Sequence, residues 1–525
     1  MRSVATLSTE RRRLLQLAAA AAGTLWLPRS AWSQPRLPDN PFALGVASGS
    51  PTASSVVLWT RLAGPALPRE PVTLRWEIAD DEGFAHIVQS GQAQALPELA
   101  HSVHVEPQGL APDRWFFYRF TIGPWVSPVG RTRTFPADDA PVERLRIAYA
   151  SCQRWEHGWF SAYRQMRADA PDAVVFLGDY IYEYPTAVDA VRAPAGGWAL
   201  SLDDYRARYA LYRSDPDLQA MHHACPWLFT WDDHEVQNDY AGTQAGSGGP
   251  QVADFARRRA GAYQAWYEHT PVRASVLTRA LQGLAAGDGL RIHGQQRFGR
   301  LATLLLLDTR QYRSPQVCTA GGRAGSGVVN PLQCAALGDA SRSMLGAQQE
   351  AWLHGELARG GAAWTVIGQS TLFGQRDFAP GPGRLLWNDG WDGYPAARRR
   401  LVEALQQSGA ANPVLLGGDV HENWVGHVKA DYEQPRSASV GVEFCGTSIS
   451  SRTTRPESIG VRLQENPHFV YAEADHRGYG LAEFTRERLQ VTLRGVDDVR
   501  RRDSGMTTLA RFVVESGRPV VQREA

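Results

Sequence analysis

Five short apolar runs between residues 145 and 416 each lead directly into a cluster of polar and ionisable side chains. The runs and their clusters are 145–150 into 151–153, 173–177 into 178–183, 227–231 into 232–235, 301–307 into 308–313, and 414–416 into 417–421. Short apolar runs that alternate with longer helical patterns are typical of an α/β layered domain. Open α/β sheets bind ligands outside the carboxyl ends of their strands. We therefore expect a layered catalytic domain over residues 143–500 that gathers these clusters at one edge.

The rest of the chain has a different pattern. Residues 40–135 contain short runs of β-branched and aromatic residues punctuated by Gly and Pro, for example 55–60, 72–76 and 115–120. This pattern predicts a small N-terminal β-sandwich-like domain, followed by a Pro- and Asp-rich linker at 135–141. Within the catalytic domain we expect helices over 202–212, 253–269 and 347–358. The C-terminal segment 501–525 is a candidate lid over the site, because 507–514 is amphipathic.

The N-terminus has the three parts of an export signal. Arg11, Arg12 and Arg13 precede an apolar run over 14–27, and Ala31-Trp32-Ser33 offers a small-residue cleavage site. Paired arginines followed by one residue and Leu-Leu resemble a twin-arginine signal. A membrane anchor is the alternative, but the run falls short of the roughly 20 residues that span a bilayer. We expect residues 1–33 to direct the protein, through the twin-arginine export machinery, to the periplasm or the medium, with no transmembrane anchor.

Composition narrows the class of partner. The formal net charge is +1, from 55 basic and 54 acidic residues, so no single-sign excess favours nucleic acid or an anionic membrane. The chain has 5 Cys. Cys318 and Cys334 bracket a Gly-rich loop and suit a local disulfide in an oxidising compartment, which leaves Cys152, Cys225 and Cys445.

The clusters contain side chains of the kinds that bind metal ions. The candidates are Cys152, Asp179, Tyr182, Asp233, Asp419 and His421. Carboxylates suit Ca, Mg, Mn or ferric iron, whereas a thiolate and a phenolate favour a strongly acidic cation. The mixed donors point to ferric iron or zinc at one subsite, beside an oxygen-only subsite for calcium or magnesium. Each residue also has a structural alternative: Cys152 as an inert buried thiol, Tyr182 as packing, and His234 as a hydrogen-bonded core histidine.

Three of the clusters form a specific combination of motifs. They are Gly178-Asp179-Tyr180-Ile181-Tyr182, Trp231-Asp232-Asp233-His234-Glu235 with Asn238, and Gly417-Gly418-Asp419-Val420-His421. This combination resembles the PhoD-type alkaline phosphatases, a branch of the metallophosphoesterases. The segments 42–49, 58–60, 391–395 and 446–450 resemble further parts of that family, so the likeness covers nearly the whole mature chain.

The resemblance implies a four-layer αββα metallophosphoesterase-like domain that holds one ferric iron (Fe3+) and calcium (Ca2+). Carried over by position, Cys152, Tyr182, Asp419 and His421 bind iron, Asp179 bridges to calcium, and Asn238 and Asp233 complete the calcium side. The first motif contains no Asp-x-His and the last contains no Gly-His-x-His, in contrast to the wider superfamily. This departure argues against an ordinary two-histidine dinuclear site and favours the variant with Cys and Tyr ligands.

The function that we predict is hydrolysis of phosphate monoesters, diesters or both by metal-activated water. Arg310, or alternatively Arg313, is the candidate clamp for the phosphate oxygens, and His234 is the candidate general acid. The substrate is a small-molecule, lipid or polymer phosphate ester. A phospholipase D-like phosphodiesterase and a non-catalytic exported protein that binds metal or polymer are the alternatives.

Overall fold

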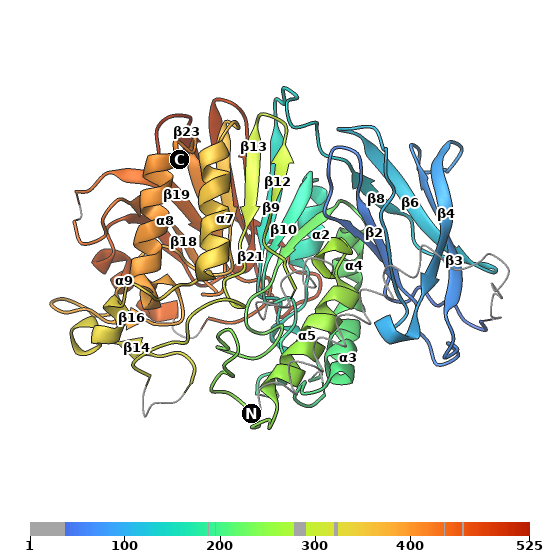
Figure 1. Cartoon of the computed structure of the whole chain (residues 1–525), viewed down its shortest axis with the longest axis horizontal. Helices are drawn as coiled ribbons and strands as arrows, with labels where there is room; N and C mark the ends of the chain where they lie inside the picture. The colour runs from blue at the N-terminus through green and yellow to red at the C-terminus, as the bar shows by residue number, and fades with distance from the viewer. Residues whose placement is uncertain are drawn as a thin grey trace.

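The computed structural model describes residues 37–524, apart from 187, 195, 278–289, 320–323, 435 and 454–455. The predicted export signal over residues 1–33 lies outside this part of the chain. Within the described part, no helix has both the length and the apolar content needed to cross a membrane. Helices combine with several sheets, in agreement with the predicted mixed α/β class (Figure 1).

The N-terminal part is built of strands, drawn in blue in Figure 1. They are β1 (Val46–Gly49), β2 (Val57–Arg61), β3 (Val72–Ala79), β4 (Ile87–Ala95), β5 (Ser102–Val105), β6 (Trp115–Ile122), β7 (Trp125–Val126) and β8 (Gly130–Arg133). One face of β6 buries Phe116, Tyr118 and Phe120, as expected for alternation along a half-buried strand. These rings share a core with Val46 of β1 and Leu58 of β2, so two layers of strands face each other.

One of these layers continues into the catalytic part of the chain. β1, β2 and β5 extend a ten-stranded sheet, because β1 pairs in parallel with β11 (Trp227–Thr230) at Gly49 and Trp227. The predicted boundary near residue 135 therefore separates two stretches of sequence but does not separate their sheets.

Two large sheets pack face to face in the centre of the molecule. The ten-stranded sheet also contains β9 (Leu145–Ala150), β10 (Ala173–Leu177), β21 (Arg477–Phe484), β22 (Arg488–Val496), β23 (Met506–Glu515) and β24 (Gln522–Arg523). The seven-stranded sheet contains β12 (Gly294–Phe298), β13 (Ala302–Leu306), β15 (Trp364–Gly368), β17 (Pro413–Gly417), β18 (Asn423–Lys429), β19 (Ser439–Cys445) and β20 (Phe469–Glu473). Val175 of the first sheet and Leu416 of the second belong to one buried core.

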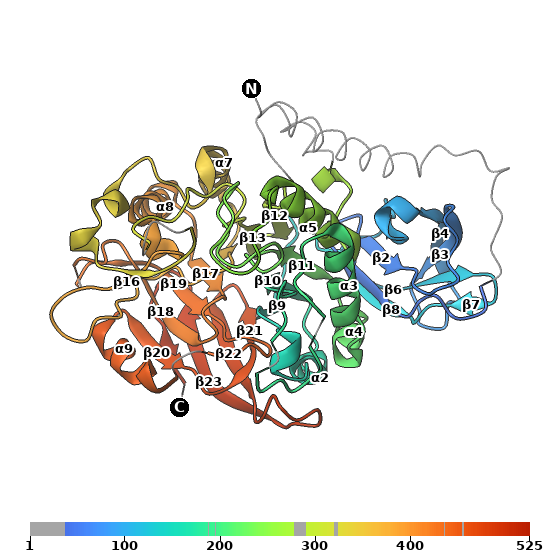
Figure 2. The same ribbon diagram turned by 90° about the horizontal axis from the view of Figure 1, so that it is seen from below.

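Helices cover the outer faces of both sheets (Figures 1 and 2). α2 (Ala162–Ala168), α3 (Leu202–Arg213), α4 (Pro216–His222) and α5 (Phe255–His269) share a core with the ten-stranded sheet, and α7 (Gly346–Arg359) and α8 (Pro395–Ser408) share one with the seven-stranded sheet. The three predicted helices are confirmed as α3, α5 and α7. α3 begins at a capping box. The Ser201 hydroxyl accepts a hydrogen bond from the Asp204 backbone N–H, and the Asp204 carboxylate accepts one from the Ser201 backbone N–H.

The C-terminal segment is a strand of the ten-stranded sheet and not the lid that the sequence predicts. Residues 506–515 form β23, which pairs along its length with β22. Phe512 and Val514 point into the core between the two sheets. The amphipathic pattern that suggested a lid therefore belongs to a strand with one buried face. Two smaller elements lie outside the large sheets. They are the two-stranded sheet of β14 (Val328–Val329) and β16 (Leu386–Trp387), and the helix α9 (Ile459–Glu465).

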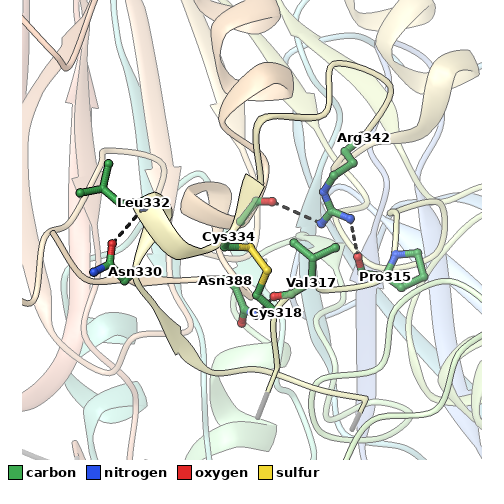
Figure 3. The surroundings of a disulfide bond; sticks show 9 residues. Pro315, Val317, Cys318, Asn330, Leu332, Cys334, Arg342 and Asn388 are labelled. Carbon is green, nitrogen blue, oxygen red and sulfur yellow. Dashed lines mark hydrogen bonds between the residues drawn. A yellow bond between two sulfur atoms is a disulfide. The ribbon is translucent and has the colours of Figure 1, made fainter. Parts of the chain in front are cut away.

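The predicted disulfide is confirmed. Cys318 and Cys334 are bonded (Figure 3). Asn388 holds this segment at two points: its side-chain N–H donates to the Val317 carbonyl at 2.7 Å, just before the closed loop, and its Oδ1 accepts from the Gly327 N–H at 2.7 Å, within the loop. The three remaining cysteines, Cys152, Cys225 and Cys445, are free and buried.

Candidate metal centre

The carboxyl ends of parallel strands from both sheets meet at one edge. β9, β10 and β11 run parallel in one sheet, and β13, β15 and β17 run parallel in the other. The Thr230 hydroxyl donates to the Leu307 carbonyl at 2.6 Å, which joins the end of β11 to the end of β13. Two glycines permit this approach: a Cβ on Gly178 would lie 2.6 Å from the Asp232 Cβ, and a Cβ on Gly418 would lie 2.4 Å from the Ser151 Oγ.

Four of the predicted metal ligands have left-handed backbone conformations. Their φ angles are 59° at Cys152, 58° at Asp179, 67° at Asp419 and 56° at His421. Non-glycine residues rarely adopt positive φ, and such strain is concentrated at functional sites. The strand-end turns therefore bring these four side chains into the site at a cost in backbone energy.

The first group of donors is Cys152, Asp179 and His421, whose ligand atoms lie within 4.8 Å of one another. The Tyr182 hydroxyl joins them, 2.9 Å from Asp179 Oδ2 and 3.1 Å from His421 Nε2. His421 Nδ1 lies 2.8 Å from the Arg452 carbonyl, which can only accept, so the proton is on Nδ1 and Nε2 presents its lone pair to the group. Ser451 Oγ lies 2.8 Å from the Tyr182 hydroxyl.

The chemistry of this group fits a bound cation. Burial and the neighbouring charge of Asp179 raise the pKa of both Cys152 and Tyr182 well above their ordinary values. Burial likewise raises the pKa of Asp179. A cation among these atoms would favour their ionised forms, as thiolate and carboxylate ligands require.

The second group is Asp179, Asp233 and His234, whose ligand atoms also lie within 4.8 Å of one another. Burial opposes ionisation of Asp233, but Arg310 and His234 outweigh it and lower the pKa of Asp233. Burial likewise disfavours an imidazolium, but Asp233 and Asp179 raise the pKa of His234 well above its ordinary value. Asn238 is held beside this group by its backbone N–H, which donates to Glu183 Oε1 at 2.7 Å.

Asp419 lies near the first group, where its charge acts on Cys152. Its carboxylate accepts a hydrogen bond from the Thr371 hydroxyl at 2.6 Å, and it does not belong to either group of donor atoms found in the described chain. Burial, and then the nearby charge of Asp232, raise the pKa of Asp419 well above its ordinary value.

The predicted phosphate clamp, Arg310, lies among carboxylates. Arg310 is 1% exposed, and its guanidinium faces carboxylates: Nε is 2.5 Å from Asp232, and Nη1 and Nη2 are 3.0 and 2.8 Å from Asp389. Arg313, the alternative, is also buried and lies 3.2 Å from Asp389. Both guanidinium groups therefore already contact buried carboxylates in this structure, and a phosphate clamp at either residue stays a prediction.

Two glutamates within the predicted motifs have roles that the sequence did not reveal. Glu235 is fully buried, and its carboxylate accepts from the backbone N–H groups of Tyr180, Asp232 and Asp179 at 2.7, 2.9 and 3.1 Å. It thereby ties the end of β10 to the end of β11. Glu183 contacts His234 and Asn238. The sequence feature that could have indicated these roles is their position: Glu183 directly follows Tyr182, and Glu235 directly follows His234.

Comparison with known proteins gives matches over both parts of the chain. The family model PhoD-like phosphatase matches residues 147–493, and the model of the N-terminal domain of PhoD-like phosphatases matches residues 29–136. Alkaline phosphatase D of Bacillus subtilis (strain 168) is 40% identical over 496 residues, which cover 92% of this chain and 82% of that protein. A solved structure described as the structure of PhoD is similar with a TM-score of 0.87 and 38% identity, covering 94% of this chain and 93% of that one. This chain therefore belongs to the PhoD-like phosphatase family and is a phosphoric ester hydrolase.

Proposed function

We propose that the protein is an exported, metal-dependent phosphoesterase in which water attacks phosphorus, built on a metallophosphoesterase-like αββα framework. The observation that carries this proposal is the position of Asp179, whose carboxylate belongs to both groups of donors. A carboxylate shared in this way is suited to bridging two cations, as in two-metal hydrolases. The third cluster of this kind in the described chain, Asp80, Asp81 and His86, is largely exposed and shares no residue with the other two.

We propose ferric iron for the first group, with Cys152, Tyr182, His421 and Asp419 as its ligands. Thiolate and phenolate are donors for a strongly acidic cation. We propose calcium for the side of Asp179 that carries Asp233 and Asn238, since calcium prefers oxygen ligands. Cations held there lower the pKa of a water molecule and neutralise charge that develops on the phosphate oxygens.

The protein residues supply orientation and a proton. Tyr182 and His421 are fixed by Ser451 and by the Arg452 carbonyl, which sets the direction of their ligand atoms. His234 is 7% exposed and lies beside the shared carboxylate of Asp179, where it can donate a proton to the leaving-group oxygen.

Two features support export. The sequence begins with a pattern resembling a twin-arginine signal. Cys318 and Cys334 form a disulfide, and structural disulfides persist in oxidising compartments such as the periplasm and the medium.

The test is phosphate-ester hydrolysis by purified protein, with 4-nitrophenyl phosphate as a monoester and bis(4-nitrophenyl) phosphate as a diester. We expect hydrolysis, because a relative of this chain bears the name alkaline phosphatase D. A chelator should abolish it and added calcium should restore it, because the carboxylates of Asp179 and Asp233 are oxygen ligands of the kind that calcium prefers. Asp179→Asn should abolish activity, whereas Asp80→Asn in the exposed cluster should not. A rate on the diester well above that on the monoester would favour the phosphodiesterase alternative. No hydrolysis of either ester by metal-loaded protein would favour the non-catalytic alternative.

A further inference from the structure

We infer that Glu183 is a positioning residue for the reaction: its carboxylate fixes the His234 imidazole so that one ring nitrogen faces the leaving group. This inference rests on the proposed function. Glu183 Oε2 lies 2.7 Å from His234 Nδ1. A carboxylate at this distance accepts a hydrogen bond from Nδ1–H, which leaves Nε2 as the nitrogen that can serve the substrate.

The surroundings of Glu183 hold its carboxylate in place. Its side chain is fully buried, and His234 is its only ion-pair partner within the described residues. The Glu183 backbone carbonyl accepts from the Ala199 N–H at 2.7 Å. A buried carboxylate is costly unless it is paired, so the position of Glu183 depends on its contact with His234.

The His234 ring is restrained on its faces as well as at Nδ1. Its centroid lies 4.2 Å from that of Tyr182 and 5.5 Å from that of Tyr184. Tyr184 is in turn stacked on Trp198 at 5.2 Å. Packing limits rotation of the ring, and the Glu183 bond selects which nitrogen faces the site.

The second oxygen of the same carboxylate serves the neighbouring residue. Glu183 Oε1 accepts from the Asn238 backbone N–H at 2.7 Å. One carboxylate thus sets the position of His234 and of the backbone that carries Asn238. Because the two bonds use both oxygens, an amide at this position could keep only one of them.

The step that this arrangement serves is cleavage of the ester bond. The oxygen of water forms a new bond to phosphorus while the bond to the leaving oxygen breaks, and that oxygen departs with the bonding electron pair. The leaving oxygen takes the proton from His234 Nε2. One proton of the attacking water replaces it on the imidazole, so that alcohol and phosphate are the products and His234 is restored.

The need for a proton donor grows with the basicity of the leaving group. The test therefore compares phenyl phosphate with 4-nitrophenyl phosphate, whose leaving group is much less basic, for the native enzyme, Glu183→Gln, His234→Asn and the double variant. We expect Glu183→Gln to lower kcat on phenyl phosphate by about 10–100-fold, the usual effect of removing such an orienting partner. The loss on 4-nitrophenyl phosphate should be several-fold smaller. The double variant should be no slower than His234→Asn, because both changes remove the same contribution.

The ratio of the two rates on one preparation does not depend on how much of the protein is folded or loaded with metal. Glu443→Gln is the matched control, since Glu443 is also buried and accepts two backbone N–H groups, from Phe373 and Gly374, without contacting His234. It should leave the ratio unchanged. If Glu183→Gln does not fold, Glu183→Asp, which keeps the charge at a shorter reach, should shift the ratio in the same direction.

Equal losses on both esters, or additive losses in the double variant, would overturn the inference. If the ratio of the two rates changes in His234→Asn but not in Glu183→Gln, the positioning role of Glu183 is wrong while the role of His234 as proton donor stands. If the native enzyme hydrolyses neither ester, it is the proposed function that fails, and this outcome is distinct from the other two.

Discussion

The Tyr182 hydroxyl lies 2.9 Å from Oδ2 of Asp179, three residues earlier in the same strand-end turn. Tyr182→Phe removes this oxygen and keeps the ring that packs on His234. We expect loss of iron from the purified protein and a fall in activity, together with a stability change of about 0.5–1.5 kcal/mol for the lost buried hydrogen bond. Elemental analysis and thermal unfolding of the same sample measure both effects.

Tyr180→Phe is the matched control for that variant. Tyr180 is equally buried, but its hydroxyl lies 2.9 Å from Nε2 of His222, which is not one of the proposed metal ligands. The Tyr180→Phe variant should lose a similar amount of stability but keep its full metal content. Full iron occupancy in Tyr182→Phe as well would remove Tyr182 from the ligands.

Cys152→Ser replaces a thiol that ionises readily beside a cation by a hydroxyl that stays protonated at neutral pH. We expect less iron per chain and a weakened or shifted charge-transfer absorbance in the visible region. Cys445→Ser, at a buried thiol whose Sγ lies 3.3 Å from the Gly418 carbonyl, should leave both unchanged. Unaltered iron and absorbance in Cys152→Ser would show that Cys152 is a structural thiol.

The strand-end clusters show how much of the site could be predicted from sequence. Cys152, Asp179, Tyr182 and His421 were predicted from their positions after short apolar strands, and the structure brings them together. The contacts that orient them could not be predicted, because Ser451 approaches Cys152 and Tyr182 across roughly 300 residues of chain that only the tertiary fold brings together.

Two further differences between expectation and structure have physical causes of the same kind. A strand with one buried face and a surface amphipathic segment look alike in sequence, so the pattern of 507–514 predicts a lid where the structure has a paired strand. Arg310 directly follows a strand, as the predicted ligands do. Only the tertiary structure reveals that its guanidinium already donates hydrogen bonds to Asp232 and Asp389.

Glu443 gives a prediction about pH. Burial raises the pKa of Glu443 to about 7 from its ordinary value of 4.5. A carboxyl group whose pKa is raised in the folded state stabilises the fold below its unfolded pKa, and this contribution is lost as pH rises through the folded value. Between about pH 4.5 and 7 the loss is on the order of 3 kcal/mol.

The measurement is unfolding by urea at pH 5 and pH 8 for the native chain and for Glu443→Gln, which cannot ionise. The native chain should lose more stability between the two pH values than the variant. An identical loss in both proteins would contradict the raised pKa.

The proposed twin-arginine export route predicts a requirement for arginine itself. Replacing Arg11, Arg12 and Arg13 by Lys keeps the positive charge but should leave the protein in the cytoplasm, because the twin-arginine route requires Arg. Cell fractionation with activity or antibody detection measures the distribution. Unchanged export of the triple variant would indicate the general secretory route.

The ten-stranded sheet has a consequence for when this chain can fold. Its order places β5, β2 and β1 at one end and β21 to β24 at the other, with β9, β10 and β11 between them. The central strands gain one neighbour from residues 46–49 and another from residues 477–484, so the sheet cannot close while the ribosome still holds the second of these segments. Contacts of such large sequence separation are slow to form and leave strand edges open in the meantime. Folding of this sheet is therefore completed only once residues 477–484 have left the ribosome, and a transport system that accepts folded proteins would suit such a chain better than one that threads it through a pore unfolded.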